Sequence, residues 1–116
     1  TVQDARVAVR AYFLLMNASE SGLVKPGDYF NIAGEEAYQL TEVVDIFLGM
    51  SVMQDIEVVT DPNRLRPIDA DYQMFDNTKL RSVIDWRPSI PVVQMFEDLL
   101  NHWREQIAKG RIPLDR

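Results

Sequence analysis

Apolar residues recur at helical spacing in four segments of the chain, and short stretches rich in Gly, Pro and Asp separate them. The first segment, residues 4–18, contains no Gly or Pro and carries apolar residues around most of its circumference. This pattern predicts a largely buried helix that ends near Gly22, because glycine is common just beyond a helix. Residues 40–50 predict a second helix, and Gln39 and Glu42 have the spacing of a capping box before it.

Two further helices are predicted in the second half of the chain. A short one runs up to Ile84, and either Asp76 or Asn77 can cap its first turn. The last helix begins near Pro91, a favoured first-turn residue, and stops at Gly110. Its apolar residues make the cleanest stripe in the chain: Val92, Phe96, Leu99, Leu100, Trp103 and Ile107.

Short β-prone runs lie between the helices. Residues 29–33 read Y-F-N-I-A, residues 56–59 alternate weakly between apolar and polar positions, and a third short strand is expected at 72–75. Four helices with two to three short strands predict an α/β fold, in the form of a small α+β-like fragment. These strands are too few and too short for a complete doubly wound sheet.

The composition narrows the function of this chain. Its net charge of −6 argues against nucleic acid as a partner, because nucleic-acid binders carry a basic face. The absence of cysteine excludes disulfides, thiolate metal sites and a cysteine nucleophile. No apolar run reaches the roughly 18 residues of a membrane span, so we expect a cytoplasmic protein without a membrane partner. The length of 116 residues fits one domain and is short for an enzyme with separate cofactor and substrate domains.

The candidate chemistry is concentrated in one loop, where two arginines stand close together in an acidic chain. Arg64 and Arg66 could hold phosphate oxygens, because a guanidinium donates two parallel hydrogen bonds to such a group. Asp69 could accept from ribose hydroxyls, as acidic residues do in nucleotide sites. The structural alternative is that these arginines only form ion pairs with Asp61, Asp69 or Asp71, and spacing alone slightly favours it.

Other familiar catalytic and cofactor patterns are missing from the sequence. The glycine fingerprint of dinucleotide sites and the phosphate-binding P-loop do not occur. The one histidine, His102, lies among charged residues of the last helix and is interpreted as a surface residue. No spacing typical of metal ligands stands out. We therefore assign no catalytic, cofactor-binding or metal-binding residue to this chain.

Several motifs, taken in order, resemble the C-terminal part of the extended short-chain dehydrogenase/reductase family. They are G-D-Y-F-N-I-A-G-E-E at 27–36, R-L-R-P-I-D at 64–69, D-N-T-K-L at 76–80 and W-R-P at 86–88. This family contains the NAD-dependent nucleotide-sugar epimerases and dehydratases. Within it, the loop D-P-N-R-L-R-P with D-N-T-K-L is most similar to GDP-mannose 4,6-dehydratases.

The resemblance implies roles for the loop residues and a larger parent enzyme. It makes Arg66 a ligand of the substrate diphosphate and Asp69 a residue that holds the nucleotide, with Arg64 a weaker candidate for phosphate. Residues 1–116 would form the C-terminal nucleotide-sugar-binding domain. An N-terminal Rossmann domain, absent from this chain, would bind NADP or NAD and supply the catalytic Tyr-x-x-x-Lys. That motif is not found here at any of the four tyrosines: Tyr12, Tyr29, Tyr38 and Tyr72.

The function implied by the resemblance is substrate binding in a nucleotide-sugar dehydratase, a lyase that converts GDP-mannose to GDP-4-keto-6-deoxymannose. The alternatives are a GDP-4-keto-6-deoxymannose reductase, another nucleotide-sugar epimerase, or a stand-alone binding module without catalysis. We expect no turnover and no bound cofactor in this chain alone. Because the first helix is apolar on nearly all sides, we also expect exposed apolar surface and either a homo-oligomer or contact with the missing Rossmann domain.

Overall fold

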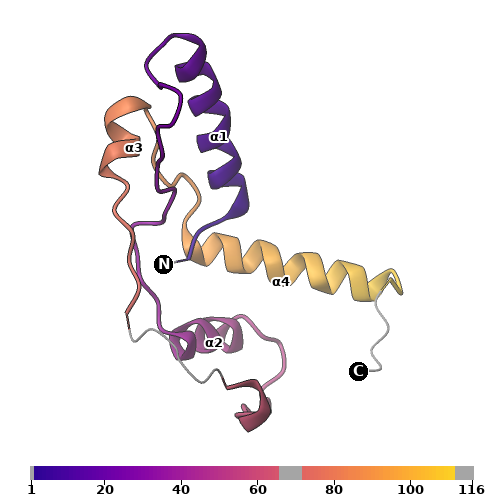
Figure 1. Ribbon diagram of the computed structural model, residues 1–116. Coiled ribbons are helices and arrows are strands. Elements are labelled where there is room, and N and C mark those ends of the chain that lie inside the picture. Colours follow the sequence, from indigo (N-terminus) through magenta and orange to yellow (C-terminus); the bar gives the residue numbers. More distant parts are fainter. Residues whose placement is uncertain (1, 66–71, 112–116) are drawn as a thin grey trace.

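The computed structural model describes residues 2–65 and 72–111. Each of the four predicted α-helices is present, with bounds within two residues of the prediction. In chain order the elements are α1 (Ala5–Glu20), α2 (Leu40–Gly49), the 3-10 turn η1 (Pro62–Arg64), α3 (Thr78–Val83) and α4 (Val92–Ala108), as Figure 1 shows. The apolar periodicity was therefore a sufficient signal for the helices.

The predicted α/β fold class is wrong for the part of the chain that the structure describes. That part is helical and contains no strand and no sheet. The segments 29–33, 56–59 and 72–75, each predicted to be a strand, have no regular secondary structure. Residues 56–59 are also exposed, so their apolar side chains have no sheet neighbour against which to pack.

Side chains, rather than a backbone ladder, join the two β-prone segments that lie near each other. The side-chain amide of Asn31 donates to the backbone carbonyl of Asp76 at 3.3 Å, and that of Asn77 donates to the carbonyl of Ala33 at 3.0 Å. The segment before α3 thus runs beside the segment that follows Asn31 (Figure 1). A ladder needs backbone donors and acceptors paired in register. Here side-chain amides occupy the carbonyls of Asp76 and Ala33 that a ladder would use.

Both ends of α1 are capped. The Asp4 carboxylate accepts a hydrogen bond from the backbone N–H of Arg6 at 2.7 Å, which satisfies one of the free donors of the first turn. At the other end the N–H of Leu23 donates to the carbonyl of Ala18 at 2.9 Å. Gly22 adopts φ 77°, the left-handed conformation that this ending requires, so the predicted C-terminal glycine is confirmed.

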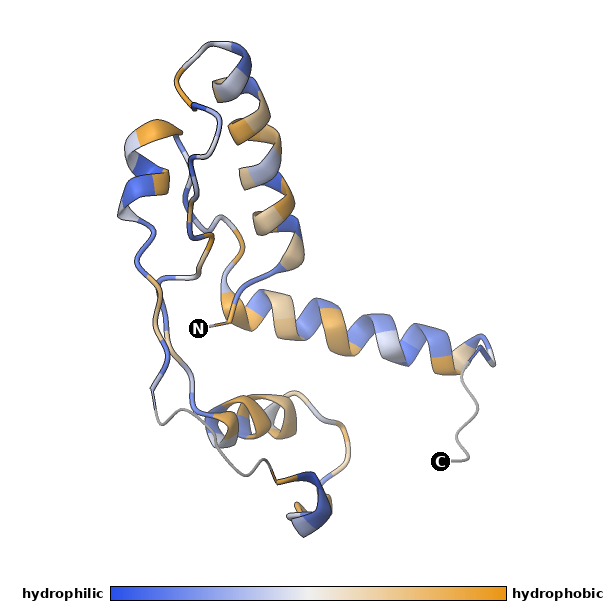
Figure 2. Cartoon of the chain, in the orientation of Figure 1, coloured by the Kyte–Doolittle hydropathy of each residue, from blue (hydrophilic) through white to orange (hydrophobic). Residues whose placement is uncertain are grey.

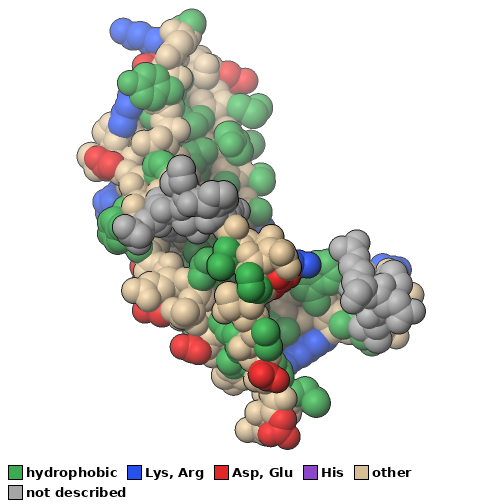
Figure 3. All heavy atoms as spheres, turned by 60° about the horizontal axis from the view of Figure 1, so that its bottom comes forward, with side chains coloured by type: hydrophobic (Ala, Val, Ile, Leu, Met, Phe, Trp, Pro, Cys, Tyr) green, Lys and Arg blue, Asp and Glu red, His purple; other side chains and the backbone are tan. Residues whose placement is uncertain are grey.

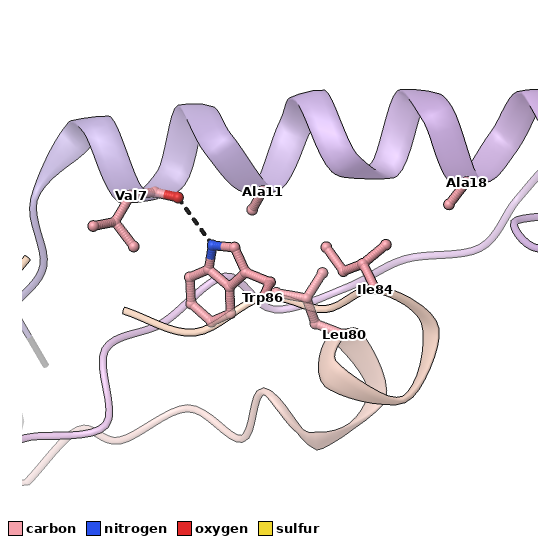
Figure 4. Close-up of a cluster of buried hydrophobic side chains, with 6 residues drawn as sticks. All are labelled: Val7, Ala11, Ala18, Leu80, Ile84 and Trp86. Atoms are coloured by element: carbon pink, nitrogen blue, oxygen red, sulfur yellow. Dashed lines mark hydrogen bonds between the residues drawn. The ribbon is translucent and has the colours of Figure 1, made fainter. Parts of the chain in front are cut away.

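The core lies between α1 and the segment from α3 to Trp86 (Figure 4). The small side chains of Ala11 and Ala18 face inward along α1 and allow close approach. Trp86 is 1% exposed, and its Nε1 donates to the carbonyl of Val7 at 3.0 Å, so its only polar group is satisfied. The buried cluster consists of Val7, Ala11, Ala18, Leu80, Ile84 and Trp86.

Contacts with both α1 and α2 hold α4 in place. Arg6 donates to Asp4 at 2.7 Å and to Asp98 at 2.5 Å, and so links the start of α1 to α4. Phe47 of α2 and Phe96 of α4 pack with ring centroids 4.9 Å apart. The distal half of α4 extends away from the other elements in Figure 1, and Figure 2 shows apolar residues interrupting its polar surface. One contact reaches further along α4, where Arg104 donates to the backbone carbonyl of Met50, the residue after α2, at 2.9 Å.

The chain is far more open than a compact domain of its size. Its radius of gyration is 18.3 Å, whereas about 13 Å is expected for a compact domain of this length. It exposes 9552 Å² of surface, whereas about 6,500 Å² is expected for a folded monomer of its mass. The excess is about 3,000 Å². Part of the exposed surface is apolar, because large side chains such as those of Val9, Tyr12 and Phe13 are exposed.

Candidate functional site

Arg64 lies at the end of η1, on the surface. Its Nε is 3.4 Å from Oδ2 of Asp61, and its side chain is 87% exposed. The Asp61 carboxylate also accepts from the backbone N–H of Asn63 at 2.9 Å, which fixes the turn. The structural alternative, in which this arginine pairs with Asp61, is therefore what the structure shows for Arg64. An exposed pair of this kind contributes only about 0–1 kcal/mol, so the guanidinium can exchange Asp61 for another anion at little cost.

Arg66 and Asp69 lie outside the described residues. Their assignment as ligands of a diphosphate and a nucleotide therefore stays a prediction. The described chain resumes at Tyr72, and residues from Met74 onward help to line a surface hollow of about 420 Å³. Its lining residues are Gly34, Glu35, Met74, Phe75, Asp76, Asn77, Thr78 and Arg81.

The hollow after the loop carries an ion pair that the sequence did not reveal. Arg81 Nη1 donates to Oε1 of Glu35 at 2.9 Å, across 46 positions of the chain. At the edge of the same hollow, hydrogen bonds from the hydroxyl and the backbone N–H of Thr78 lower the pKa of Asp76. Arg81 therefore offers a cation, and Glu35 and Asp76 offer two carboxylates, to a polar ligand in the hollow. No spacing rule would have paired Arg81 with Glu35, because they belong to separate elements.

Gly34 fits at the edge of this hollow because it lacks a side chain. A Cβ at this position would lie 2.6 Å from the backbone carbonyl oxygen of Val2, closer than packed atoms allow. The segment before α1 thus passes directly over Gly34. This close approach holds the G-E-E motif, whose first glutamate is Glu35, against the start of the chain.

Lys79 has a structural environment rather than a catalytic one. Its Nζ lies 4.5 Å from the ring centroid of Tyr29 and 4.8 Å from that of Phe30, and it is 3.6 Å from the Asp28 carboxylate. The charge rests over the ring faces, which is a cation–π contact. The Asp28 carboxylate accepts a hydrogen bond from the backbone N–H of Lys25, and this bond and the Lys79 charge lower its pKa.

The described residues do not fit a dinucleotide cofactor. Such a cofactor places its pyrophosphate at a helix N-terminus that follows a glycine-rich turn. The first turn of α1 is instead occupied by the Asp4 carboxylate, and Glu42 accepts from the backbone N–H of Gln39 at the start of α2. Both carboxylates would repel a pyrophosphate. We therefore derive no chemical step of NAD or NADP on these residues.

Within residues 2–65 and 72–111, no group of three or more potential His, Cys, Asp or Glu ligands comes together. His102 is exposed on α4, as expected, and its ring meets that of Trp103 edge to face at 5.4 Å. In those same ranges, no helix has the length and apolar character needed to cross a membrane.

Sequence comparison finds a distant similarity between this chain and a known enzyme. No family model matches the sequence. The chain is 21% identical over 106 residues to the GDP-6-deoxy-D-mannose reductase of Pseudomonas aeruginosa. The match covers 91% of this chain but 33% of that protein, so the chain spans about a third of its relative's length. The similarity supports a distant relation to the nucleotide-sugar reductases and dehydratases.

Proposed function

We propose that this chain is the nucleotide-sugar-binding part of an NAD(P)-dependent enzyme acting on a GDP-linked hexose. The observation that carries the proposal is the similarity of this chain, over 91% of its length, to an enzyme named for a GDP-linked deoxymannose. The R-L-R-P-I-D loop supports it, because it concentrates two guanidiniums in a chain of net charge −6. The cofactor domain, a Rossmann domain, lies outside these residues and supplies hydride chemistry when NAD or NADP is bound.

In this proposal the loop grips the diphosphate and thereby positions the sugar. Arg66 donates to the phosphate oxygens, Asp69 accepts from the nucleotide, and Arg64 adds a second cation once it exchanges Asp61 for phosphate. Positioning of a substrate is itself a large share of catalysis. The chain alone accordingly binds the nucleotide sugar and does not turn it over.

The test is calorimetric titration of GDP into the purified chain and into two arginine variants. Wild-type chain should bind GDP saturably at one site. Arg66→Ala should weaken this binding by about 10–150-fold, the equivalent of a lost charge-assisted hydrogen bond of about 1.5–3 kcal/mol. Arg87→Ala removes the same charge from an exposed position outside the loop and should leave the affinity unchanged.

Two results would contradict the proposal. One is wild-type chain that shows no saturable GDP binding. The other is equal loss of affinity in Arg66→Ala and Arg87→Ala, because this would show that only the net charge matters.

Two reaction classes are candidates. The motif resemblance implies a dehydratase, and the alternative is a reductase. The similarity to a reductase favours the reductase, so we place it first. The two enzymes share the GDP group and differ in the sugar that must fit. A reductase part should bind GDP-4-keto-6-deoxymannose more tightly than GDP-mannose in a competition titration, and a dehydratase part should show the reverse order.

A further inference from the structure

Helix α1 has a second apolar face, which points away from the core. Val9, Tyr12, Phe13 and Met16 are each 60–64% exposed, although they are large apolar side chains. Their spacing of i, i+3, i+4 and i+7 places them on one face of the helix, which we name the outer stripe. In Figure 3, hydrophobic side chains gather along the side of the molecule where α1 lies.

The outer stripe lies opposite the face that α1 already buries. At about 100° per residue, its centre is roughly half a turn from that of the inner positions Val7, Ala11 and Ala18. A helix that is apolar on both sides belongs to the interior of a larger protein. In layered folds such a helix lies between two other layers. The structure shows one of these layers, formed by α3 and the segment to Trp86, but not the other.

The exposed apolar surface continues beyond the stripe. A hollow of about 570 Å³ borders it and is shared by Tyr12, Tyr29, Phe30 and Phe75. Tyr29 is 81% exposed and Phe75 46%. The stripe alone offers a few hundred Å², the size of the largest patch on an ordinary monomer. Stripe and hollow together approach the roughly 800 Å² per partner of a stable interface.

We propose that the outer stripe and its hollow are the docking face for the cofactor-binding part of the same enzyme. This inference rests on the proposed function and adds the surface through which the two parts meet. The reductase relative extends over three times the matched length, so a whole domain's worth of chain lies outside the match. A flat apolar sheet face is the surface that a helical stripe of this kind covers in layered α/β proteins.

The test is co-expression of the full 116-residue chain with the P. aeruginosa reductase from which the matched third has been removed. The two should co-purify in a one-to-one complex. Met16→Glu, which places a charge in the stripe, should reduce the captured amount at least tenfold. Val52→Glu adds the same charge at a residue that is 83% exposed and outside the stripe, and should leave capture unchanged. Circular dichroism should show equal helix content in both variants.

A thiol probe reports the contact directly, because the chain contains no native cysteine. Met16→Cys should react with a maleimide as fast as Val52→Cys in the free chain and at least tenfold more slowly in the complex. Failure to capture, or equal loss in both glutamate variants, overturns the proposal. Protection of Met16→Cys that rises with the concentration of the free chain also overturns it, because the occupant is then a second copy. A complex that forms without GDP binding would refute the proposed function and leave the docking face standing.

Discussion

Replacing Trp86 probes the core on which the positions of α1 and α3 depend. The indole is 1% exposed, touches the apolar side of α1, and donates its one N–H to the Val7 carbonyl at 3.0 Å. Trp86→Ala removes the ring and leaves a cavity, at a cost of about 3–5 kcal/mol of unfolding free energy. Trp86→Phe keeps much of the ring packing but loses the hydrogen bond, and should cost about 1 kcal/mol from that loss, plus a smaller packing term.

Urea unfolding followed by far-UV circular dichroism measures these costs. Trp103 offers the matched control, because it is 48% exposed on α4, and Trp103→Phe should change the unfolding free energy by about 0.5 kcal/mol or less. The expected order of stability is Trp103→Phe, then Trp86→Phe, then Trp86→Ala. Equal costs for the two phenylalanine variants, or a cost below about 1 kcal/mol for Trp86→Ala, would refute the placement of the core.

Two further predictions concern the start of the chain. Gly34→Ala should destabilise the chain by about 1–3 kcal/mol in urea unfolding, because its Cβ would meet the Val2 carbonyl oxygen at 2.6 Å. Gly49→Ala, where a Cβ has open space, should not destabilise, and equal effects of the two changes would contradict the close approach. Hydrogen bonds from Arg6 lower the pKa of Asp4 below its ordinary value near 3.8. The stability from this contact is therefore complete above about pH 4 and is lost as the pH falls through the lowered pKa; Asp4→Asn should flatten the acid limb of a stability–pH curve, and an unchanged limb would refute this contribution.

The helices could be predicted from the sequence because their signals are local. Apolar spacing, the left-handed Gly22 and the acidic residues before the first turns act within a few positions of each other. The capping residue of α3 was left open between two neighbours. In the structure Asp76 accepts from the N–H of Thr78 at 2.7 Å, whereas Asn77 turns its side chain to Ala33. That choice depends on a segment 44 residues away, which local patterns do not contain.

The predicted strands are absent from the described residues because a strand depends on a neighbouring strand, which local sequence patterns do not contain. The β-prone residues 29–33 have a suitable composition, but Asn31 and Asn77 use side-chain amides where a sheet would use backbone groups. Arg64 shows the same limit for the site, since the loop sequence allowed both a phosphate ligand and an ion pair and its spacing only slightly favoured the ion pair. The structure places it against Asp61, and the roles of Arg66 and Asp69 depend on the binding experiments.

The most direct test of the proposed function is an NMR titration of GDP into the isotope-labelled chain. Binding by the arginine loop should shift the backbone amide signals of residues 61–69 in a saturable way. The signals of the distal half of α4, around His102, should stay in place. Saturable shifts confined to the loop, and lost in Arg66→Ala, are the result we expect. No shift at saturating GDP, or shifts centred on α4, would contradict a nucleotide-sugar site in this loop.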